Sequence, residues 1–284
     1  MPVCDVCFRH CKIEENSIGF CGARTCRDGK IISANYGRLT SLALDPIEKK
    51  PLKMFHPGSN ILSLGSYGCN LRCPFCQNSS ISWSEKAFEY INRADYYSPE
   101  EIVKTALDLR PRGNIGLAFT YNEPLISYEF VRDTAKLSKE AGLHNVLVTN
   151  GTATQKVLNE ILPYIDAMNI DLKAFTPRFY HDFINGDLQM VKEFIQTAVA
   201  TTTCHVELTT LIIPQENDSE EEMRELSAWV AALENQSHKK IPLHITRFFP
   251  AFHLTDRDAT PIPTILRLVE VAKENLEYVF PGNI

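Results

Sequence analysis

Three closely spaced cysteines constrain this chain more than any other feature. Cys69, Cys73 and Cys76 follow the spacing C-x3-C-x2-C within one loop that also contains glycine and proline. Thiolates at this spacing can hold an iron–sulfur cluster, but a 4Fe-4S cluster normally takes four cysteine ligands. A loop with three cysteines therefore leaves one iron without a protein ligand, and an open metal position is where a small molecule can bind and react.

Two other interpretations of this loop are a zinc site and a set of inert buried thiols. A structural zinc site needs a fourth cysteine or histidine, and residues 58–97 contain none besides these three cysteines. Buried core thiols rarely share one loop with glycine and proline. The spacing therefore favours a cluster with an open position over both alternatives.

The composition excludes several classes of protein. Of the 284 residues, 44% are hydrophobic and 23% are charged, as in ordinary globular proteins. The net charge of −6 argues against a broad basic surface for nucleic acid. No apolar run approaches the roughly 18 residues of a membrane span, and no secretory signal is visible at the N-terminus. We therefore expect a cytoplasmic protein without nucleic-acid or membrane partners, in which the nine cysteines are metal ligands more than disulfides.

A second group of cysteines lies near the N-terminus. Four thiolates suit either a closed tetrahedral zinc site or a second iron–sulfur cluster, and the candidates are Cys4, Cys7, Cys11 and Cys21. His10 and Cys26 are spare candidates. The spacing does not separate zinc from iron; a second cluster could relay electrons, whereas zinc would only stabilise the fold. Because a short unit is stabilised poorly by its core alone, we expect residues 1–57 to form a small cysteine-rich unit and residues 58–284 to form the main domain.

Strands and helices alternate from Ile61 onward. We expect strands at residues 61–66, 115–120, 145–149, 167–171, 205–213 and 243–248, and helices from residue 98 and at residues 127–141, 154–162, 188–201, 219–233 and 263–275. The β-then-α order predicts parallel strands with right-handed crossovers. Six such units predict an α/β fold with a partial (β/α)6 barrel, although a doubly wound open sheet would show the same local pattern.

Polar residues follow the predicted strands at the end where the active sites of parallel barrels gather. They are Asn122, Glu123 and Pro124 after the second strand, Asn150 after the third, Asp171 and Lys173 after the fourth, and His244 on the sixth. Glu123, fixed by the following proline, is suited to accept a hydrogen bond from an ammonium group. Asp171 and Lys173 are two residues apart and therefore lie on one side of the strand.

Each of these residues also has a structural interpretation. Glu123 could be an ordinary carboxylate at a helix N-terminus, and Asp171 with Lys173 could form an exposed ion pair that contributes little. A single histidine on an apolar strand, such as His244, is commonly a hydrogen-bonded core residue. The cysteine loop favours a binding site for the acidic residues, whereas the two interpretations of His244 are balanced.

The cysteine loop, with Phe75 directly before its last cysteine, resembles the signature of the radical S-adenosylmethionine (SAM) superfamily. Along nearly its whole length the chain resembles the pyruvate formate-lyase activating-enzyme-like branch, and within it the AmmeMemoRadiSam family. The motifs that carry this resemblance are the N-terminal cysteines and residues 36–38, 45–52, 57–59, 69–78, 120–124 and 248–250.

The resemblance implies a 4Fe-4S cluster held by Cys69, Cys73 and Cys76. SAM would chelate the open iron, and the reduced cluster would cleave SAM to a 5′-deoxyadenosyl radical. Two positions depart from the pattern of activating enzymes, because Tyr121 replaces a glycine and Val148 replaces an aspartate. The cofactor-binding residues implied by the resemblance are Phe75, Asn122, Glu123, Pro124, Asn150, Asp171, Lys173 and His244.

The function implied by the resemblance is that of a radical SAM oxidoreductase that abstracts a hydrogen atom. Its expected partners are an electron donor such as flavodoxin or ferredoxin and a protein substrate, a glycyl-radical enzyme. The alternatives are a radical SAM enzyme that modifies a small molecule or another protein, and a non-catalytic iron–sulfur or zinc module. The sequence identifies no catalytic residue beyond the cofactor-binding set.

Overall fold

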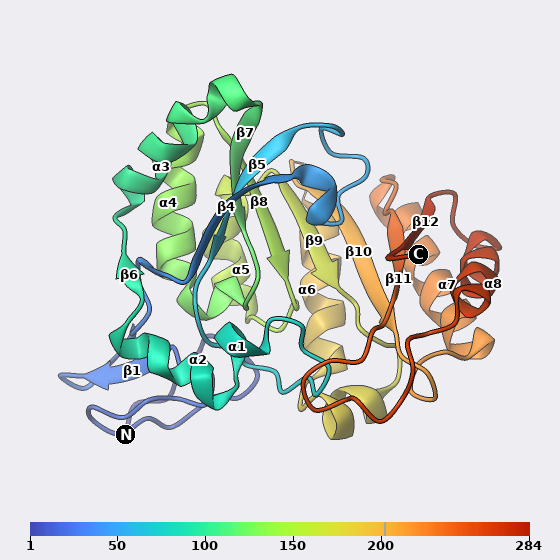
Figure 1. Ribbon diagram of the computed structural model, residues 1–284, viewed down its shortest axis with the longest axis horizontal. Coiled ribbons are helices and arrows are strands. Elements are labelled where there is room, and N and C mark those ends of the chain that lie inside the picture. The colour runs from blue at the N-terminus through green and yellow to red at the C-terminus, as the bar shows by residue number, and fades with distance from the viewer. Residues whose placement is uncertain (202) are drawn as a thin grey trace.

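The computed structural model describes residues 1–201 and 203–284, and its centre is a curved eight-stranded sheet (Figure 1). The strands are β4 (Ser41–Pro46), β5 (Asn60–Gly65), β7 (Asn114–Phe119), β8 (His144–Thr149), β9 (Ala167–Asp171), β10 (His205–Ile212), β11 (Leu243–Arg247) and β12 (Val279–Gly282). They lie in the order β12-β11-β10-β9-β8-β7-β5-β4. All neighbours are parallel except β4, which runs antiparallel to β5. Since β4 and β12 are separate edges, the sheet forms a partial barrel, and the predicted α/β fold is confirmed.

Helices cover the outer face of the sheet and alternate with its strands (Figure 1): α3 (Pro99–Asp108), α4 (Tyr128–Glu140), α5 (Gln155–Ile161), α6 (Leu188–Ala200), α7 (Glu220–Ser237) and α8 (Ile262–Lys273). All the predicted strands and helices are present, with ends that differ by a few residues. The predicted helix start at residue 98 is confirmed, because Ser98 and Glu101 form a capping box. Within the described residues, no helix has the length and apolar character needed to cross a membrane.

The two faces of the sheet carry side chains of different size. Leu117 and Phe119 on β7 pack in the main core between the sheet and the helices. Ala118 lies between them and therefore points to the opposite, inner face. Ser63 on β5 is paired with Ala118 and shares that face. The small inward side chain of Ala118 leaves room for the apolar residues Ile47 and Leu52, which pack in the same cluster.

The segment between β4 and β5 fills one end of the barrel interior. Ile47 and Leu52 of this segment are fully buried and pack against inward residues of the strands. Two main-chain amides of the same segment donate to the buried carboxylate of Glu207 on β10. The predicted division placed residues 1–57 in a separate unit, but residues 41–55 belong to the barrel. Their proline-rich composition is typical of a linker, yet it serves here as a packed plug.

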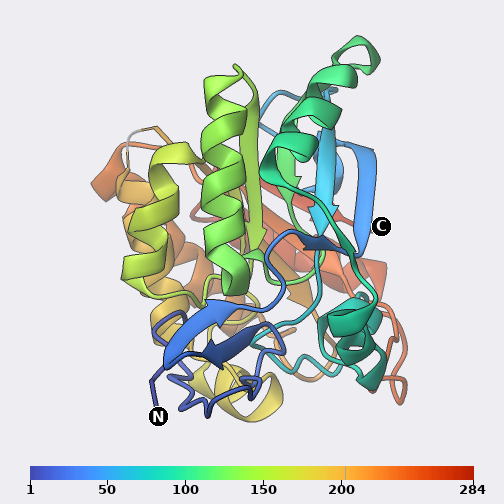
Figure 2. The same cartoon turned by 90° about the vertical axis from the view of Figure 1, so that its left-hand side faces the viewer.

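The N-terminal residues lie against the other end of the barrel, where the strands end (Figure 2). The segment joins the barrel through main-chain and side-chain contacts: Thr154 N donates to Val6 O at 2.9 Å, and Lys156 Nζ lies 2.6 Å from Asp5 Oδ2. The short elements at this end are β1 (Arg24–Arg27), β2 (Lys30–Ser33), β3 (Arg38–Leu39), β6 (Asp95–Tyr96), α1 (Ser79–Ser82), α2 (Glu85–Glu89) and the π-helix η6 (Phe179–Phe183).

A buried ion pair joins the edge strand β4 to the segment that follows it. Lys50 Nζ lies 2.8 Å from Asp45 Oδ2, and the two side chains are only 2% and 12% exposed. The hydroxyl of Tyr121, in the loop after β7, donates to the same carboxylate. Lys49 also reaches Asp45, at 3.2 Å, but its side chain is 66% exposed. Lys50 therefore makes a buried contact with the Asp45 carboxylate, and Lys49 makes an exposed contact with the same group.

Replacing the buried lysine is expected to destabilise the protein far more than replacing its neighbour. Lys50→Met leaves the Asp45 carboxylate buried without its main cation, which costs on the order of 3–5 kcal/mol. Lys49→Met removes an exposed partner and is expected to change the free energy of unfolding by less than about 1 kcal/mol. Urea unfolding of both variants measures the difference. Equal stability of the two variants would contradict a structural role for the buried pair.

Candidate functional site

A cavity of about 620 Å³ lies inside the barrel at the carboxyl ends of the strands. This volume is in the range of small-molecule sites. The predicted site residues that line it are Cys69, Cys73, Phe75, Cys76, Asn122, Glu123, Asn150, Asp171 and Lys173. The structure therefore brings together residues from the loops after β5, β7, β8 and β9, which are far apart in the sequence.

The cysteine loop is held in place by its own turn and by aromatic packing. The main-chain amide of Cys76 donates to Cys73 O at 3.2 Å. Phe75 is buried, and its ring centroid lies 5.8 Å from that of Phe183. Gly68, just before the loop, has φ +93°, and a Cβ there would lie only 2.5 Å from a main-chain oxygen. Glycine is therefore required for the chain to enter this loop.

Burial disfavours the thiolate form of two thiols of this loop, those of Cys69 and Cys73. Burial raises the pKa of Cys73 to about 12, although the nearby Lys173 ammonium lowers it. Burial also raises the pKa of Cys69, and the charges of Cys73 and Glu123 add to the increase. Thiolates are the form that binds metal, and coordination to a metal deprotonates a thiol outright. The loop is thus suited to metal binding rather than to nucleophilic chemistry by free thiolates.

The carboxylate of Glu123 connects the loop after β7 with the end of β8. Its Oε1 accepts hydrogen bonds from Leu125 N at 3.0 Å and from Thr149 Oγ1 at 2.7 Å. Its Oε2 accepts from Asn150 N at 2.8 Å. Burial nevertheless raises the pKa of Glu123 to about 7, because these donors only partly compensate for the loss of water.

Short amide side chains join the cysteine loop to the neighbouring strand ends. Asn150 Nδ2 donates to Asn70 Oδ1 at 2.9 Å, and Asn70 Nδ2 donates to Thr152 Oγ1 at 2.8 Å. Asn122 accepts from Ser66 N at 3.0 Å. These bonds satisfy main-chain and side-chain groups that have no partner in the sheet ladder. The three loops therefore behave as one hydrogen-bonded unit.

Asp171 and Lys173 form an ion pair at the cavity wall. Their charged atoms are 2.8 Å apart, and their side chains are 31% and 16% exposed. Burial tends to lower the pKa of Lys173, but the attraction of Asp171 and Cys73 outweighs it and raises the pKa. Both residues line the cavity, as their spacing on β9 predicts. Lys173 is therefore a cation beside the cysteine loop.

The sequence matches the radical SAM superfamily over residues 64–227, the part that contains the cysteine loop and the strand ends. The chain belongs to the radical SAM superfamily. It is 39% identical to an uncharacterised protein of Methanocaldococcus jannaschii, over 99% of this chain and 81% of that protein. It is also 28% identical to the pyruvate formate-lyase-activating enzyme of Clostridium pasteurianum, over 62% of this chain and 72% of that enzyme.

Solved structures share the radical SAM fold at low sequence identity. SuiB of Streptococcus suis, solved with bound SAM, superposes with a TM-score of 0.59 at 12% identity, over 77% of this chain and 49% of SuiB. The family implies a 4Fe-4S cluster and SAM as cofactors. The donor set fits this cluster, because the three thiols line a cavity that has room for a further small-molecule ligand.

Two predicted cofactor-binding residues lie outside this radical SAM cavity. His244 is buried below it, and its Nε2 lies 2.6 Å from Glu207 Oε2. The residue of β11 that reaches the cavity is instead Thr246, two positions further along the strand. Pro124 begins the short 3-10 helix η4 (Pro124–Ser127) and supports Glu123 rather than lining the cavity. The structure thus supports the core interpretation of His244, in which a carboxylate partner holds the ring.

Several cavity residues were not predicted. Thr209 and Leu211 on β10 and Thr246 on β11 point into the cavity, because side chains two apart on a strand share a face. Their alternation was visible in the sequence, but the register between strands was not. Val148, which replaces the aspartate of activating enzymes, also lines the cavity and gives this part of the wall an apolar side chain.

Tyr121 stands where activating enzymes have a glycine before Glu123, and the structure shows how the larger residue is accommodated. Its φ is +73°, a left-handed conformation that glycine adopts freely and other residues adopt at a cost. The Tyr121 hydroxyl donates to Asp45, and Lys50 Nζ lies 4.7 Å from the centre of its ring. These contacts hold the strained residue in place and couple this loop to strand β4.

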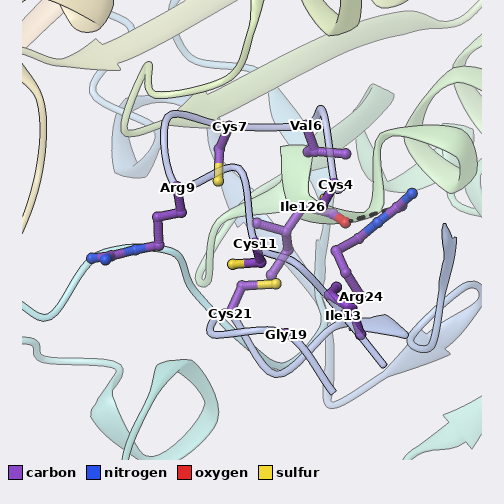
Figure 3. Close-up of a pocket in the computed structure, with 10 residues that line it drawn as sticks. All are labelled: Cys4, Val6, Cys7, Arg9, Cys11, Ile13, Gly19, Cys21, Arg24 and Ile126. Carbon is purple, nitrogen blue, oxygen red and sulfur yellow. Dashed lines mark hydrogen bonds between the residues drawn. The ribbon is translucent and has the colours of Figure 1, made fainter. Parts of the chain in front are cut away.

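The four cysteines predicted to hold a second metal lie around a separate small cavity near the N-terminus. Cys4, Cys7, Cys11 and Cys21 all line it (Figure 3). The spare candidates lie elsewhere: His10 is exposed, and the thiol of Cys26 is 3.3 Å from Glu15 Oε2. The structure therefore brings Cys4, Cys7, Cys11 and Cys21 together and places His10 and Cys26 apart from them, and metal binding by these four cysteines stays a prediction.

The buried Glu207 carboxylate is expected to make stability sensitive to acid. Burial by itself raises its pKa, but hydrogen bonds from His205, His244 and two main-chain amides lower the pKa to about 2. An ordinary unfolded glutamate titrates near about 4.3. Since the folded pKa is the lower one, the stabilisation is present above about pH 5 and is lost as the pH falls toward about 2.

Glu207→Gln is expected to remove this acid-sensitive contribution, which is on the order of 3 kcal/mol. The difference in unfolding free energy between the wild type and this variant should therefore shrink between pH 5 and pH 3. Glu140→Gln, at an exposed position of α4, is the matched control and is expected to show no such trend. A difference that stays constant with pH would contradict the shift assigned to Glu207.

Proposed function

We propose that this radical SAM enzyme binds SAM at a 4Fe-4S cluster held by Cys69, Cys73 and Cys76, and that it abstracts a hydrogen atom from its substrate. One observation carries the proposal: the three thiols line the same cavity as Glu123 and the Asp171–Lys173 pair. When bound, the reduced cluster supplies the electron that cleaves SAM to a 5′-deoxyadenosyl radical. The residues of the chain position the cofactor and exclude water from it.

Glu123 is proposed to receive the ammonium group of SAM. An ionised carboxylate offers about four acceptor positions, and Glu123 uses three of them for donors within the protein. One position therefore stays open toward the cavity. A charge-assisted hydrogen bond from an ammonium group would favour the ionised form and compensate for burial of the carboxylate.

Lys173 is proposed to attract the carboxylate of SAM. Its ammonium is mostly buried at the cavity wall and is paired with Asp171 alone among the carboxylates of the described residues. Asp171, the more exposed partner, is left to accept a further cation or donor. Asn122 and Asn150 hold the loops on either side, and Phe75 packs beneath the cysteines.

We propose a protein or peptide as the substrate, with a glycyl-radical enzyme as the first candidate. The activating enzyme of Clostridium pasteurianum is named for a protein substrate, and SuiB has also been solved with its precursor peptide. A flavodoxin or ferredoxin would supply the electrons. A small-molecule substrate is the second candidate, because the chain is also 29% identical over 54% of its length to a GTP 3′,8-cyclase of Peptoclostridium acidaminophilum. A glycyl EPR signal on the candidate enzyme after incubation would separate the two.

The chemistry at the cysteine loop is tested by an anaerobic assay for SAM cleavage. The wild-type protein, reconstituted with iron and sulfide and then reduced, is expected to form 5′-deoxyadenosine from SAM. The variant with Cys69, Cys73 and Cys76 all replaced by alanine is expected to form none, because the cluster loses its ligands. Cys204→Ala, at a buried thiol outside the cavity, is the control. Equal amounts of 5′-deoxyadenosine from the triple variant would exclude this loop as the site of SAM cleavage. If the wild type contains a complete, reducible cluster but neither binds nor cleaves SAM, the result would favour a non-catalytic module.

Glu123→Gln is expected to weaken SAM binding by roughly 10- to 100-fold, because a hydrogen bond to a charged group contributes about 1.5–3 kcal/mol. Calorimetry on the reconstituted protein measures this affinity. Glu160→Gln on α5, whose partner is Arg132 on the outer face, is expected to bind SAM as the wild type does. Unchanged affinity in the Glu123 variant, with normal iron content, would assign this carboxylate to loop structure alone.

A further inference from the structure

The four N-terminal cysteines lie directly against the loop that carries Cys69. Figure 3 shows the sulfur atoms of Cys7, Cys11 and Cys21 facing the same space between the N-terminal loops. The main-chain amide of Cys69 donates to Cys21 O at 3.0 Å. One hydrogen bond therefore joins a cysteine of the N-terminal set to a cysteine of the radical SAM loop.

Two arginines lie between the N-terminal cysteines and the radical SAM loop. Arg9 Cζ and Arg72 Cζ lie 3.4 and 3.7 Å from the centre of the Phe20 ring. Figure 3 shows Arg9 extending from the cysteine-lined cavity, and its Nε donates to Asn70 O in the radical SAM loop. Arg72 donates to the carbonyl oxygens of Cys69, Leu71 and Phe20, which completes the bridge.

The charges of these arginines are not compensated by carboxylates. The hydrogen bonds of both guanidinium groups within the described residues run to neutral carbonyl oxygens. Arg9 lines the same cavity as the four N-terminal cysteines. Partly buried cations without an anionic partner are costly. Anionic metal–thiolate groups on both sides of Phe20 would supply the missing negative charge.

The arrangement of the thiols favours a cluster over a single ion. A zinc ion needs its sulfur ligands within about 2.3 Å of one point. In the part of the chain that the structure describes, no three cysteine, histidine or acidic side chains are arranged to hold one ion. This is equally true of Cys69, Cys73 and Cys76, the loop of the superfamily's cluster. In a 4Fe-4S cluster each thiolate binds a different iron, so the four thiols need to surround a space rather than meet at a point.

We propose that Cys4, Cys7, Cys11 and Cys21 hold a second iron–sulfur cluster, which passes electrons to the cluster of the radical SAM loop. The relay rests on the proposed function of Cys69, Cys73 and Cys76, whereas the second cluster does not. A low-potential donor protein loses one electron and reduces the N-terminal cluster. That cluster is then reoxidised as the same electron passes across the Cys21–Cys69 contact, and no bond or proton changes place.

The metal content of the variant with Cys69, Cys73 and Cys76 replaced by alanine tests the second cluster without any assay of activity. After anaerobic reconstitution, we expect about 8 irons per wild-type chain and about 4 irons with matching sulfide in the variant. Reduction of the variant should then give an EPR signal of an iron–sulfur cluster. One zinc ion per chain, or no metal at all, would overturn the proposal even if the wild type cleaves SAM.

The charge of Arg9 is expected to change the reduction potential of the N-terminal cluster, which a purely structural residue would leave unchanged. Because reduction adds negative charge to the cluster, Arg9→Gln is expected to lower its reduction potential in the same alanine variant. Arg27→Gln, at an exposed position of β1, is the matched control and should leave the potential unchanged. Equal potentials in the two variants would contradict contact between Arg9 and the cluster.

The relay is tested with two reductants. Cys7→Ala with Cys21→Ala removes ligands of the N-terminal cluster only. This double variant is expected to cleave SAM with dithionite, a small reductant that can reach the radical SAM cluster directly, but to lose most of its activity with reduced flavodoxin. Wild-type rates with flavodoxin would overturn the relay, and loss of the radical SAM cluster itself from the variant would assign the N-terminal cysteines to structure.

Discussion

Main-chain groups at the ends of parallel strands have no partner in the sheet ladder, and this protein buries many of them. Such groups must be satisfied by side chains or water. Glu123, Asn122 and Asn150 do this with side-chain oxygens that accept hydrogen bonds from main-chain amides of the loops. The same side chains line the cavity, so the bonds that make the strand ends stable also place polar groups around the cysteine loop. The stability of the strand ends and the polar lining of the cavity therefore depend on one hydrogen-bonded network.

The sequence allowed prediction of the alternating fold, and most of the residues predicted for the radical SAM site line the cavity. Strands and helices of this kind have clear periodicity, and parallel strands bring their carboxyl ends to one place. Glu123, Asp171 and Lys173 were found because each follows such a strand. Placing His244 correctly requires the register of β11, which depends on pairing with β10 and cannot be read from one strand alone.

The positions of segments without a periodic pattern could not be predicted from the sequence. The segment after β4 is rich in proline and charge, which is typical of a linker, but Ile47 and Leu52 fill the interior of the barrel. Its buried Lys50 is neutralised by Asp45, a local contact made because the short 3-10 helix η1 (Ile47–Lys49) turns the chain back after β4. The cysteine-rich N-terminal segment occupies the opposite end. The two ends of the barrel therefore differ, because one is filled by apolar packing and the other has the N-terminal cysteines near it.

The two free edges of the sheet limit how another protein can bind. An exposed edge strand is a template for strand addition, and proline interrupts such a template because it has no amide hydrogen to donate. Strand β4 ends in Pro46 and strand β12 contains Pro281. Neither edge therefore offers an unbroken row of donors. A polypeptide partner would be recognised by side chains around the cavity rather than by extension of the sheet, which also protects the molecule against edge-to-edge aggregation.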